Sequence, residues 1–327
     1  MKRFVSYILA VCMLVCLLGG CAQNEPEQTE QAEVIRVGAL TGPTAMGLVK
    51  LMDDNDNKLT ENNYEFSLQS EAAAFAAALA KGETDIAAVP ANLASVIYNN
   101  TNGAIKLLAI NTLGVLYIVE RGESIESFTD LAGKTLYATG EGATPEYALR
   151  YLLKENGIDG ENEPDIHWCS DTTEALSYIS ADENAIAMLP QPFVTAAQAK
   201  VDGLRVAIDM NKEWEKLGNG SAMVTGVLVV RSEFAEKYPE QLAAFMKEYE
   251  SSVQFVQQNN AEAAELIGGY EIVKAPIAQK ALPNCNITFV TGEQMQSEME
   301  GYLSVLADMN PAAIGGKLPG NDFYYGK

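Results

Sequence analysis

Short apolar segments alternate along the chain with longer amphipathic ones, and turns rich in glycine, proline and polar residues separate them. The apolar segment 34–40 leads into Thr41-Gly42-Pro43-Thr44, after which residues 45–52 have the apolar spacing of a helix. The same succession recurs twice, with strands predicted at 64–68 and 85–89 and helices at 71–81 and 93–98. Strands that alternate with helices of this length form parallel βαβ units, so the pattern predicts an α/β protein.

A second series of strand and helix begins near residue 115. The strand at 136–138 precedes the turn 139–144, and Thr144, followed by Pro145 and Glu146, predicts a helix start with Thr144 as the N-cap. Further elements follow the same logic: helix 172–179, strand 185–189, a turn at 190–193, a buried strand at 224–230, and helices at 232–259 and 292–308. The chain therefore contains two successive α/β units.

The first 21 residues differ from the rest of the sequence. Lys2 and Arg3 precede an apolar run over 4–18, and the small residues Gly19 and Gly20 lead to Cys21. The run is shorter than the roughly 20 residues of a membrane-spanning helix and is typical of a signal peptide. The segment resembles a bacterial lipoprotein leader. The resemblance implies a lipoprotein signal peptide over 1–20, lipidation of Cys21, and an anchor on the outer face of the cytoplasmic membrane.

Residues 21–33 are rich in Gln and Glu and show no apolar periodicity, which predicts a flexible tether. Acidic residues number 44 and basic residues 22, so the formal net charge is −22, or −24 without Lys2 and Arg3. Such a charge repels phosphate backbones and anionic lipids. Nucleic acid is therefore not an expected partner, and a polybasic membrane-binding surface is excluded. The 48 % apolar composition is sufficient to form a core.

Cysteine and histidine are too sparse for a structural zinc site, which needs about four clustered nitrogen or sulfur ligands. Beyond Cys21 only Cys169 and Cys285 remain, and His167 is the single histidine of the chain. His167 and Cys169 are predicted to occupy alternate positions of one strand. We therefore expect neither a metal nor a cofactor. Disulfides form outside the cytoplasm, where the chain is expected. The sequence therefore leaves open whether Cys169 pairs with Cys285.

Four turns end strands and begin helices, and they are the candidate binding elements. In an open parallel sheet, ligands lie beyond the carboxyl ends of the strands, next to the positive helix N-termini. Backbone N–H groups, hydroxyls and amides in such turns hold small polar or anionic molecules. The four turns are 41–45, 90–92, 139–144 and 190–193.

Several of these segments together resemble the solute-binding lipoproteins of ABC importers in the nitrate, sulfonate, taurine and thiamine-precursor group. The resemblance covers nearly all of the chain after the leader. It rests on the order of phrases such as Gly42-Pro43-Thr44-Ala45-Met46-Gly47, Lys81-Gly82-Glu83-Thr84-Asp85, Asp130-Leu131-Ala132-Gly133-Lys134-Thr135, Thr144-Pro145-Glu146, Leu189-Pro190-Gln191-Pro192-Phe193 and Gly315-Gly316-Lys317-Leu318-Pro319.

The resemblance implies a type 2 periplasmic-binding-protein fold, in which two parallel-sheet lobes are joined by two crossover strands. Lobe one would comprise 34–113 plus 231–327 and lobe two 114–230, with crossings near 115–119 and 227–230. The expected protein is a monomer that binds a small molecule between the lobes and delivers it to an ABC permease with its ATPase. It is not expected to be an enzyme.

Carried over turn by turn, the resemblance also implies a set of ligand-binding residues that face the cleft. Lobe one would supply Thr41, Gly42, Thr44, Ala45 and Asn92. Lobe two would supply Thr139, Glu141, Gly142, Thr144 and Gln191.

Two features of these turns bear on the chemistry of the ligand. Gln191 stands where many relatives have glutamate, and the turns contain no Arg or Lys, the nearest being Lys50 and Arg150. A sulfonate or nitrate is usually bound by a guanidinium. The sequence therefore favours a neutral or heteroaromatic ligand over a small anion. Two further functions fit the same architecture: an enzyme of the menaquinone-biosynthesis kind, and a sensor that binds its ligand without transport.

Overall fold

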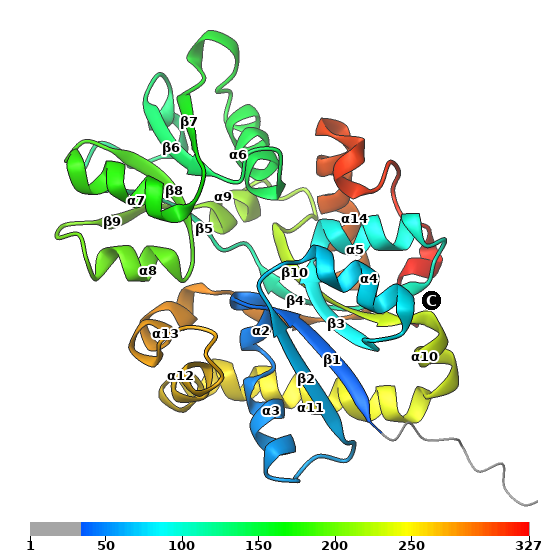
Figure 1. Cartoon of the computed structure of the whole chain (residues 1–327). Helices are drawn as coiled ribbons and strands as arrows, with labels where there is room; N and C mark the ends of the chain where they lie inside the picture. The colour runs from blue at the N-terminus through cyan, green and yellow to red at the C-terminus, as the bar shows by residue number, and fades with distance from the viewer. Residues whose placement is uncertain (1–33, 327) are drawn as a thin grey trace, which may run out of the picture. The chain divides into compact units, whose positions relative to one another are not determined.

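The computed structural model describes residues 34–326, which form two β-sheets with helices packed against them (Figure 1). The first sheet has the strand order β11-β4-β10-β3-β1-β2 and the second the order β7-β6-β8-β5-β9. The strands are β1 Ile35–Leu40, β2 Tyr64–Gln69, β3 Ile86–Pro90, β4 Ile105–Leu113, β5 Leu116–Glu120, β6 Thr135–Thr139, β7 Asp165–Cys169, β8 Ile186–Pro190, β9 Arg205–Asp209, β10 Val224–Arg231 and β11 Ile287–Val290.

We call the first sheet and its helices lobe one, and the second sheet and its helices lobe two. The helices of lobe one are α2 Pro43–Met46, α3 Val49–Asp56, α4 Ala73–Lys81, α5 Ala91–Asn100, α10 Ser232–Lys237, α11 Pro239–Gln258, α12 Asn260–Gly269, α13 Ala275–Ala281 and α14 Gly292–Met309. Those of lobe two are α6 Thr144–Glu155, α7 Thr172–Ala181, α8 Phe193–Gln198 and α9 Met210–Lys216. Short 3-10 helices are η1 Phe128–Leu131, η2 Gly160–Asn162, η3 Leu282–Asn284, η4 Pro311–Ile314 and η5 Asn321–Phe323.

The predicted two-lobed α/β architecture is confirmed, but neither sheet is wholly parallel. β1 pairs in parallel with β2 and β3, and β6 pairs in parallel with β7 and β8. β10 runs antiparallel to β3 and β4, β11 runs antiparallel to β4, and β5 runs antiparallel to β8 and β9. β5 and β10 enter their sheets directly from the other lobe, and both run antiparallel to the strands beside them.

The second crossing lies earlier in the chain than the sequence predicted. Residues 224–230 were assigned to lobe two, with the crossing at 227–230, but β10 pairs with β3 and β4 in the sheet of lobe one. The chain therefore leaves lobe two after α9, over residues 217–223, before β10 begins. The other crossing joins β4 to β5 through residues 114–115 and overlaps the predicted segment 115–119 only at residue 115.

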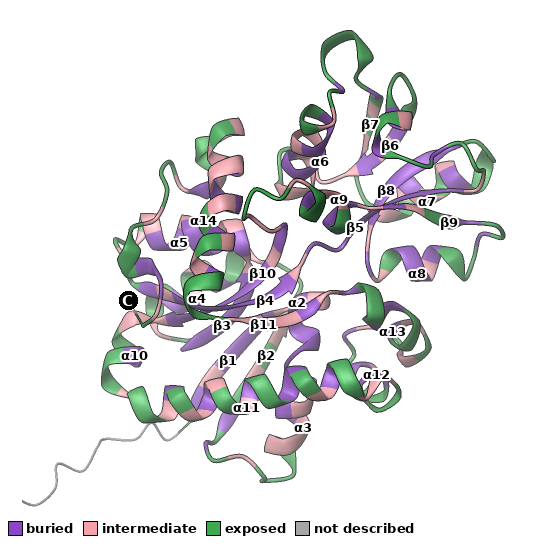
Figure 2. Ribbon diagram, turned by 180° about the vertical axis from the view of Figure 1, so that it is seen from behind, coloured by how far each residue is buried: buried purple, intermediate pink, exposed green. Residues whose placement is uncertain are grey.

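The central strands of both sheets consist mostly of buried residues (Figure 2). Successive residues of these strands mostly belong to different apolar clusters. On β3, Ala87 and Val89 belong to one apolar cluster with α5 and α14, whereas Ile86 and Ala88 belong to another with α3 and α11. β5 divides in the same way, with Ile118 facing α6 and its two neighbours facing α7 and α8. In both strands successive side chains alternate between two apolar clusters, and no residue is exposed. This pattern is typical of a central strand that is covered on both faces.

The predicted signal peptide (1–20), tether (21–33) and Cys21 lie outside the described residues. Over 34–326, no helix has both the length and the apolar character needed to cross a bilayer. Cys169 and Cys285 are both buried and both free, so they do not pair. Cys169 ends β7, and His167 lies two residues before it on the same strand, as predicted.

Candidate functional site

A cavity of about 330 Å³ lies between the two lobes, at the edge where the parallel strands end. β1 and β3 from lobe one and β8 from lobe two end at residues that line this cavity, which we call the cleft cavity. Its lining consists of Leu40, Thr44, Pro90, Asn92, Val115, Leu116, Ala143, Thr144, Pro145, Ala148, Pro190, Met223, Thr225 and Tyr302. The position beyond the carboxyl ends of strands is where open α/β sheets bind ligands.

Three of the predicted site residues, Thr44, Asn92 and Thr144, line the cleft cavity. Thr44 is buried on α2, and its carbonyl oxygen accepts a hydrogen bond of 3.0 Å from Nδ2 of Asn111 on β4. The Asn92 amide is oriented by a 3.3 Å bond from its Nδ2 to the Ala313 carbonyl. Lobe one therefore presents the Thr44 hydroxyl and the Asn92 amide to the cavity. Thr44 is held in place through its backbone carbonyl, and Asn92 through its side-chain amide.

The other predicted site residues are absent from this lining. Thr41 and Glu141 are exposed, whereas Ala45 and Gln191 are buried. The Gln191 side chain points into its own turn, because its Oε1 accepts hydrogen bonds from the backbone N and the Oγ1 of Thr195 at 3.3 and 2.9 Å. The structure thus brings three predicted residues together in the lining. Seven predicted residues do not belong to it: Thr41, Gly42, Ala45, Thr139, Glu141, Gly142 and Gln191.

The helix start at Thr144 differs from the prediction in one respect. α6 begins at Thr144 with Ala143 as its N-cap, and no side chain caps it, so the prediction of Thr144 as the N-cap is wrong. Instead, the Glu146 carboxylate reaches back and accepts a 2.7 Å bond from the Gly142 backbone N. The Thr144 hydroxyl is therefore not used by the helix and is available to the cavity that Thr144 lines.

Carboxylates already engage Arg150 and Lys50, which follow two of the predicted turns in the sequence. Glu146 Oε1 accepts a 2.7 Å bond from Nε of Arg150, and Arg150 also lies 3.5 Å from Glu163. Burial tends to raise the pKa of Glu146, but the bonds from Gly142 and Arg150 outweigh it, so its pKa lies below the ordinary value. In lobe one, the ammonium of Lys50 lies 2.9 and 2.6 Å from two aspartates of its own helix.

Several lining residues come from distant parts of the chain and were not predicted from the sequence. Tyr302 lies on α14 and is almost fully buried, and burial raises the pKa of its phenol above the ordinary value. Met223 and Thr225 come from the second crossing and the start of β10. Thr225 is the one polar residue within the apolar run 224–230, a signal that the sequence did contain. Nothing local marked Tyr302, because only the tertiary fold brings α14 to the cleft.

The cleft cavity suits binding better than general acid or base catalysis. No carboxylate, imidazole, amine or thiol occurs among its lining residues, and Tyr302 is the only one of them with a titratable side chain. Its polar groups are hydroxyls and an amide, set among prolines and aliphatic side chains. A mostly apolar cavity with a few placed polar groups is typical of small-molecule sites.

Comparison with protein families agrees with this fold. Residues 102–263 match the family model described as NMT1/THI5 like. No curated protein sequence is similar enough to this chain to match it.

Solved structures resemble almost the whole chain. An ABC transporter protein from Parabacteroides distasonis is 24 % identical, with a TM-score of 0.76, and the match covers 90 % of this chain and all of that one. The periplasmic aliphatic sulphonate binding protein of Escherichia coli is 14 % identical, with a TM-score of 0.68 and coverages of 91 % and 100 %. The periplasmic nitrate-binding protein of Synechocystis PCC 6803 is 12 % identical, with a TM-score of 0.58 and coverages of 86 % and 82 %. These structures confirm the fold that the resemblance implied, and the family model matches part of the chain.

Proposed function

We propose that this chain, which carries an NMT1/THI5-like domain on the fold of ABC-transporter solute-binding proteins, captures a small molecule between its lobes for import. The observation that carries the proposal is the cleft cavity, to which both lobes contribute. A molecule held by Thr44 and Asn92 on one side and Thr144 on the other stabilises the arrangement in which the lobes are close. Such closure by hinge motion is a recognised response of two-lobed binding proteins.

The ligand is a small polar molecule that is neutral at physiological pH and preferably heteroaromatic. The lining has no charged side chain, and carboxylates already engage Arg150 and Lys50. Prolines, Met223 and Tyr302 provide the apolar surface that a flat ring needs. Hydroxyls and an amide can pair with ring nitrogens and exocyclic donors without a charge in the cavity.

A small anion such as a sulfonate or nitrate is the alternative, and the start of α6 is the feature that would favour it. Helix N-termini bind anions through free N–H groups and the helix dipole. Here the Glu146 carboxylate already accepts a bond from Gly142 at this end, which places a negative charge beside the cavity. An anion would meet this carboxylate, whose charge is paired with Arg150, instead of free N–H groups, and it would find no guanidinium in the lining.

The remaining predicted residues complete the site when the lobes close. Thr41 and Gly42 follow β1. Thr139 ends β6, and Glu141 and Gly142 lie in the turn between β6 and α6, immediately before the lining residues Ala143 and Thr144. Closure of the lobes would bring these two turns towards each other. We infer that Thr139 and Glu141 then contact the ligand, whereas Ala45 and Gln191 support their turns from within.

The proposed test measures which class of compound stabilises the protein. Native mass spectrometry of freshly purified protein should reveal a retained neutral molecule, because closed two-lobed proteins often keep their ligand. In thermal melting, a binding compound at a hundredfold excess over its Kd adds roughly 2.7 kcal/mol of stability. We expect heteroaromatic vitamins and their precursors to raise Tm and taurine, other sulfonates and nitrate to have no effect. The reverse result would establish the anion alternative.

The proposed lipid anchor at Cys21 has a separate test. The thiol is the acylated group, so Cys21→Ala cannot carry the lipid. We expect the variant to accumulate as an unprocessed precursor or to appear in the medium, which cell fractionation and immunoblotting would detect. A processed Cys21→Ala chain that stays on the membrane after a mild salt wash would contradict the lipoprotein assignment.

A further inference from the structure

Three side chains of different ligand types meet on one face of lobe two, outside the cleft cavity. His167 and Cys169 occupy alternate positions of β7, and Glu174 lies in the first turn of α7, which follows it. The ligand atoms of these three residues all lie within 4.8 Å of one another. None of the three residues lines the cleft cavity.

The local fold explains why these residues meet. Side chains two apart on a strand point to the same face, and the short turn after Cys169 brings the start of α7 over that face. Asp171 caps the helix by accepting bonds from Thr173 N and Glu174 N at 2.7 and 2.9 Å. The whole cluster therefore arises from eight consecutive residues, 167–174.

The donor atoms of the cluster can reach an ion, although the Cys169 thiol donates a 3.8 Å hydrogen bond to the His167 carbonyl oxygen. Oε2 of Glu174 accepts hydrogen bonds from N and Oγ of Ser170 at 2.7 and 2.8 Å, and its Oε1 has no hydrogen-bond partner among the described residues. His167 is exposed on the edge strand β7, and Cys169 is buried beneath it. An incoming ion would thus meet the imidazole first and the thiol last.

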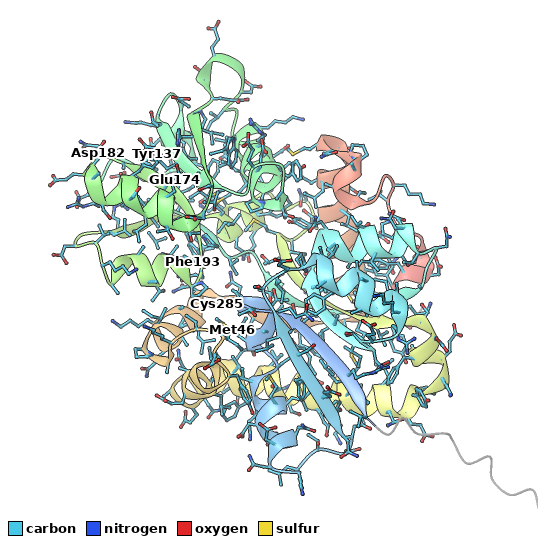
Figure 3. The ribbon with its side chains drawn as sticks, viewed as in Figure 1. Met46, Tyr137, Glu174, Asp182, Phe193 and Cys285 are labelled. Atoms are coloured by element: carbon cyan, nitrogen blue, oxygen red, sulfur yellow. The ribbon has the colours of Figure 1, made fainter. Side chains whose placement is uncertain are left out.

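Aromatic neighbours restrict the imidazole of His167. Tyr137 and Tyr178 stack on each other with ring centroids 4.2 Å apart, and both meet the His167 ring edge to face, at 5.5 and 5.1 Å. Figure 3 shows Tyr137 and Glu174 together on lobe two, whereas Cys285 lies in lobe one. A ligand side chain whose rotation is limited in this way loses less entropy on binding.

We propose that His167, Cys169 and Glu174 bind a thiophilic divalent ion of the zinc class, with solvent as the fourth ligand. Thiolate, imidazole and carboxylate are the donors that zinc takes, and three protein ligands with an open fourth position form a common zinc geometry. Tetrahedral coordination needs donor atoms about 3.5 Å apart, so His167 and Glu174 must move by roughly 1 Å. The exposed imidazole and the half-buried carboxylate can turn by that amount, and the thiol proton leaves to solvent.

The site is distinct from the structural four-cysteine or cysteine-histidine zinc sites that the sequence excluded. A search for clustered nitrogen and sulfur ligands cannot find it, because its third protein ligand is a carboxylate. The preference for zinc over magnesium follows from the soft sulfur donor, since magnesium takes oxygen ligands and retains its waters.

The experiment titrates the full-length chain with ZnCl₂ under reducing conditions and, in parallel, with MgCl₂ by isothermal calorimetry. We expect zinc to bind and magnesium to give no heat. Substitution with Co²⁺ should add a thiolate-to-metal absorption band, which reports a sulfur ligand directly. Cys169→Ser should remove one zinc equivalent and the band, and Glu174→Gln should weaken binding on the order of 10- to 100-fold.

Matched variants separate this site from other thiols and acids. Cys285→Ser removes a buried thiol of lobe one, and Asp182→Asn removes an acid directly after α7 (Figure 3), so both should bind zinc like the parent. His167→Phe keeps the packing against Tyr137 and Tyr178 but should lose zinc. Equal binding of zinc and magnesium, or identical titrations of Cys169→Ser and Cys285→Ser, would overturn the proposal. Absence of the cobalt band in the parent would do the same without any variant.

Discussion

The two lobes are built alike at the end remote from the cleft cavity. In lobe one, buried Asp85 directly precedes β3 and accepts hydrogen bonds from Arg36 and Arg231 at 2.8 to 3.0 Å. In lobe two, buried Glu120 ends β5 and bonds to Arg205 and to the loop that follows the strand. Each lobe thus ties a central strand to its neighbours through one carboxylate and arginine side chains.

Beside the cleft the lobes differ in how their turns are held. The Thr44 carbonyl bonds to Asn111, which lies 67 residues further along the chain on a central strand. The turn of lobe two is held mainly by neighbouring residues, because the Gly142 backbone bonds to Glu146 and to the Tyr147 hydroxyl in the next helix. That hydroxyl also accepts a 2.8 Å bond from Asn310 of lobe one. Local bonds of partly exposed groups open at low free-energy cost. Lobe one therefore offers a fixed surface, and lobe two the turn that adapts to a ligand.

The largest loss of stability is expected from the carboxylates remote from the cleft cavity, where the two lobes are alike. Glu120→Gln removes the charge that Arg205 and the loop surround, and breaking a buried ion pair is strongly destabilising. Because Arg205 is 36 % exposed and can regain water, we expect a loss of about 3 kcal/mol rather than more. Asp85→Asn should act similarly in lobe one. Urea denaturation measures both, and a loss below about 1 kcal/mol in one variant alone would show that the two ends are not equivalent.

Acid should weaken lobe two through the same residue. Burial tends to raise the pKa of Glu120, but bonds from Ser124, Ile125 and Arg205 outweigh it, so the pKa is lower than the usual 4.5. The ionised Glu120 carboxylate therefore contributes fully to the free energy of unfolding above pH 4.5. This contribution is lost as the pH falls through the lower pKa of the folded state. The parent should lose stability below pH 4.5 more steeply than Glu120→Gln. Parallel melting curves for the two proteins over that range would contradict this assignment.

Much of the fold follows from local pattern, and its exceptions have a topological cause. The apolar strands and the helix starts at Ser232 and Gly292 were predicted close to their observed positions. The run 224–230 was recognised as a buried strand but assigned to the wrong lobe. Its apolar residues are equally suited to either sheet, and only long-range pairing with β3 and β4 decides between them.

The site was predicted only in part, because the sequence gives turns but not the distances between them. Thr44, Asn92 and Thr144 were found from helix-start chemistry, and all three line the cavity. The role of Thr144 as a cap was wrong because Glu146, two residues further on, bonds to the turn before the helix. Tyr302 was missed since its helix reaches the cleft from the other end of the chain.

Another prediction concerns the hydrogen bond that supports the turn of lobe one. Asn111→Ala leaves the buried Thr44 carbonyl without its partner, and an unsatisfied buried acceptor costs about 2 kcal/mol. The position of Thr44 should loosen as well, so affinity for the ligand should fall. Asn184→Ala, in an exposed turn of lobe two, is the control and should change stability by less than about 0.5 kcal/mol. If thermal melting shows the two variants to be alike, the turn of lobe one is not fixed by Asn111.

The next prediction concerns the affinity for the ligand and not the stability of the free protein. Because no side chain caps α6, Thr144→Val should leave the melting temperature of the free protein unchanged while one hydrogen bond to the ligand is lost. We expect Kd to rise by about five- to thirtyfold, which corresponds to about 1 to 2 kcal/mol. Thr139→Val and Glu141→Gln should raise Kd by smaller factors, if the turn closes on the ligand as proposed. Calorimetric titrations of both that stay within twofold of the parent would exclude this turn from the site.

The smallest effect is expected from the adaptable turn itself. Gly142 has φ +69°, a left-handed conformation, and a Cβ placed there would meet no atom within 4 Å. Gly142→Ala therefore adds strain without a clash and should cost about 1 kcal/mol. Gly142→Asn should cost less, because asparagine adopts the left-handed region more readily than alanine does. Thermal melting of the two variants gives the comparison. If the asparagine variant is as unstable as the alanine variant, the loss of stability does not arise from backbone conformation. The turn of lobe two would then be less able to adapt to a ligand than its local hydrogen bonds suggest.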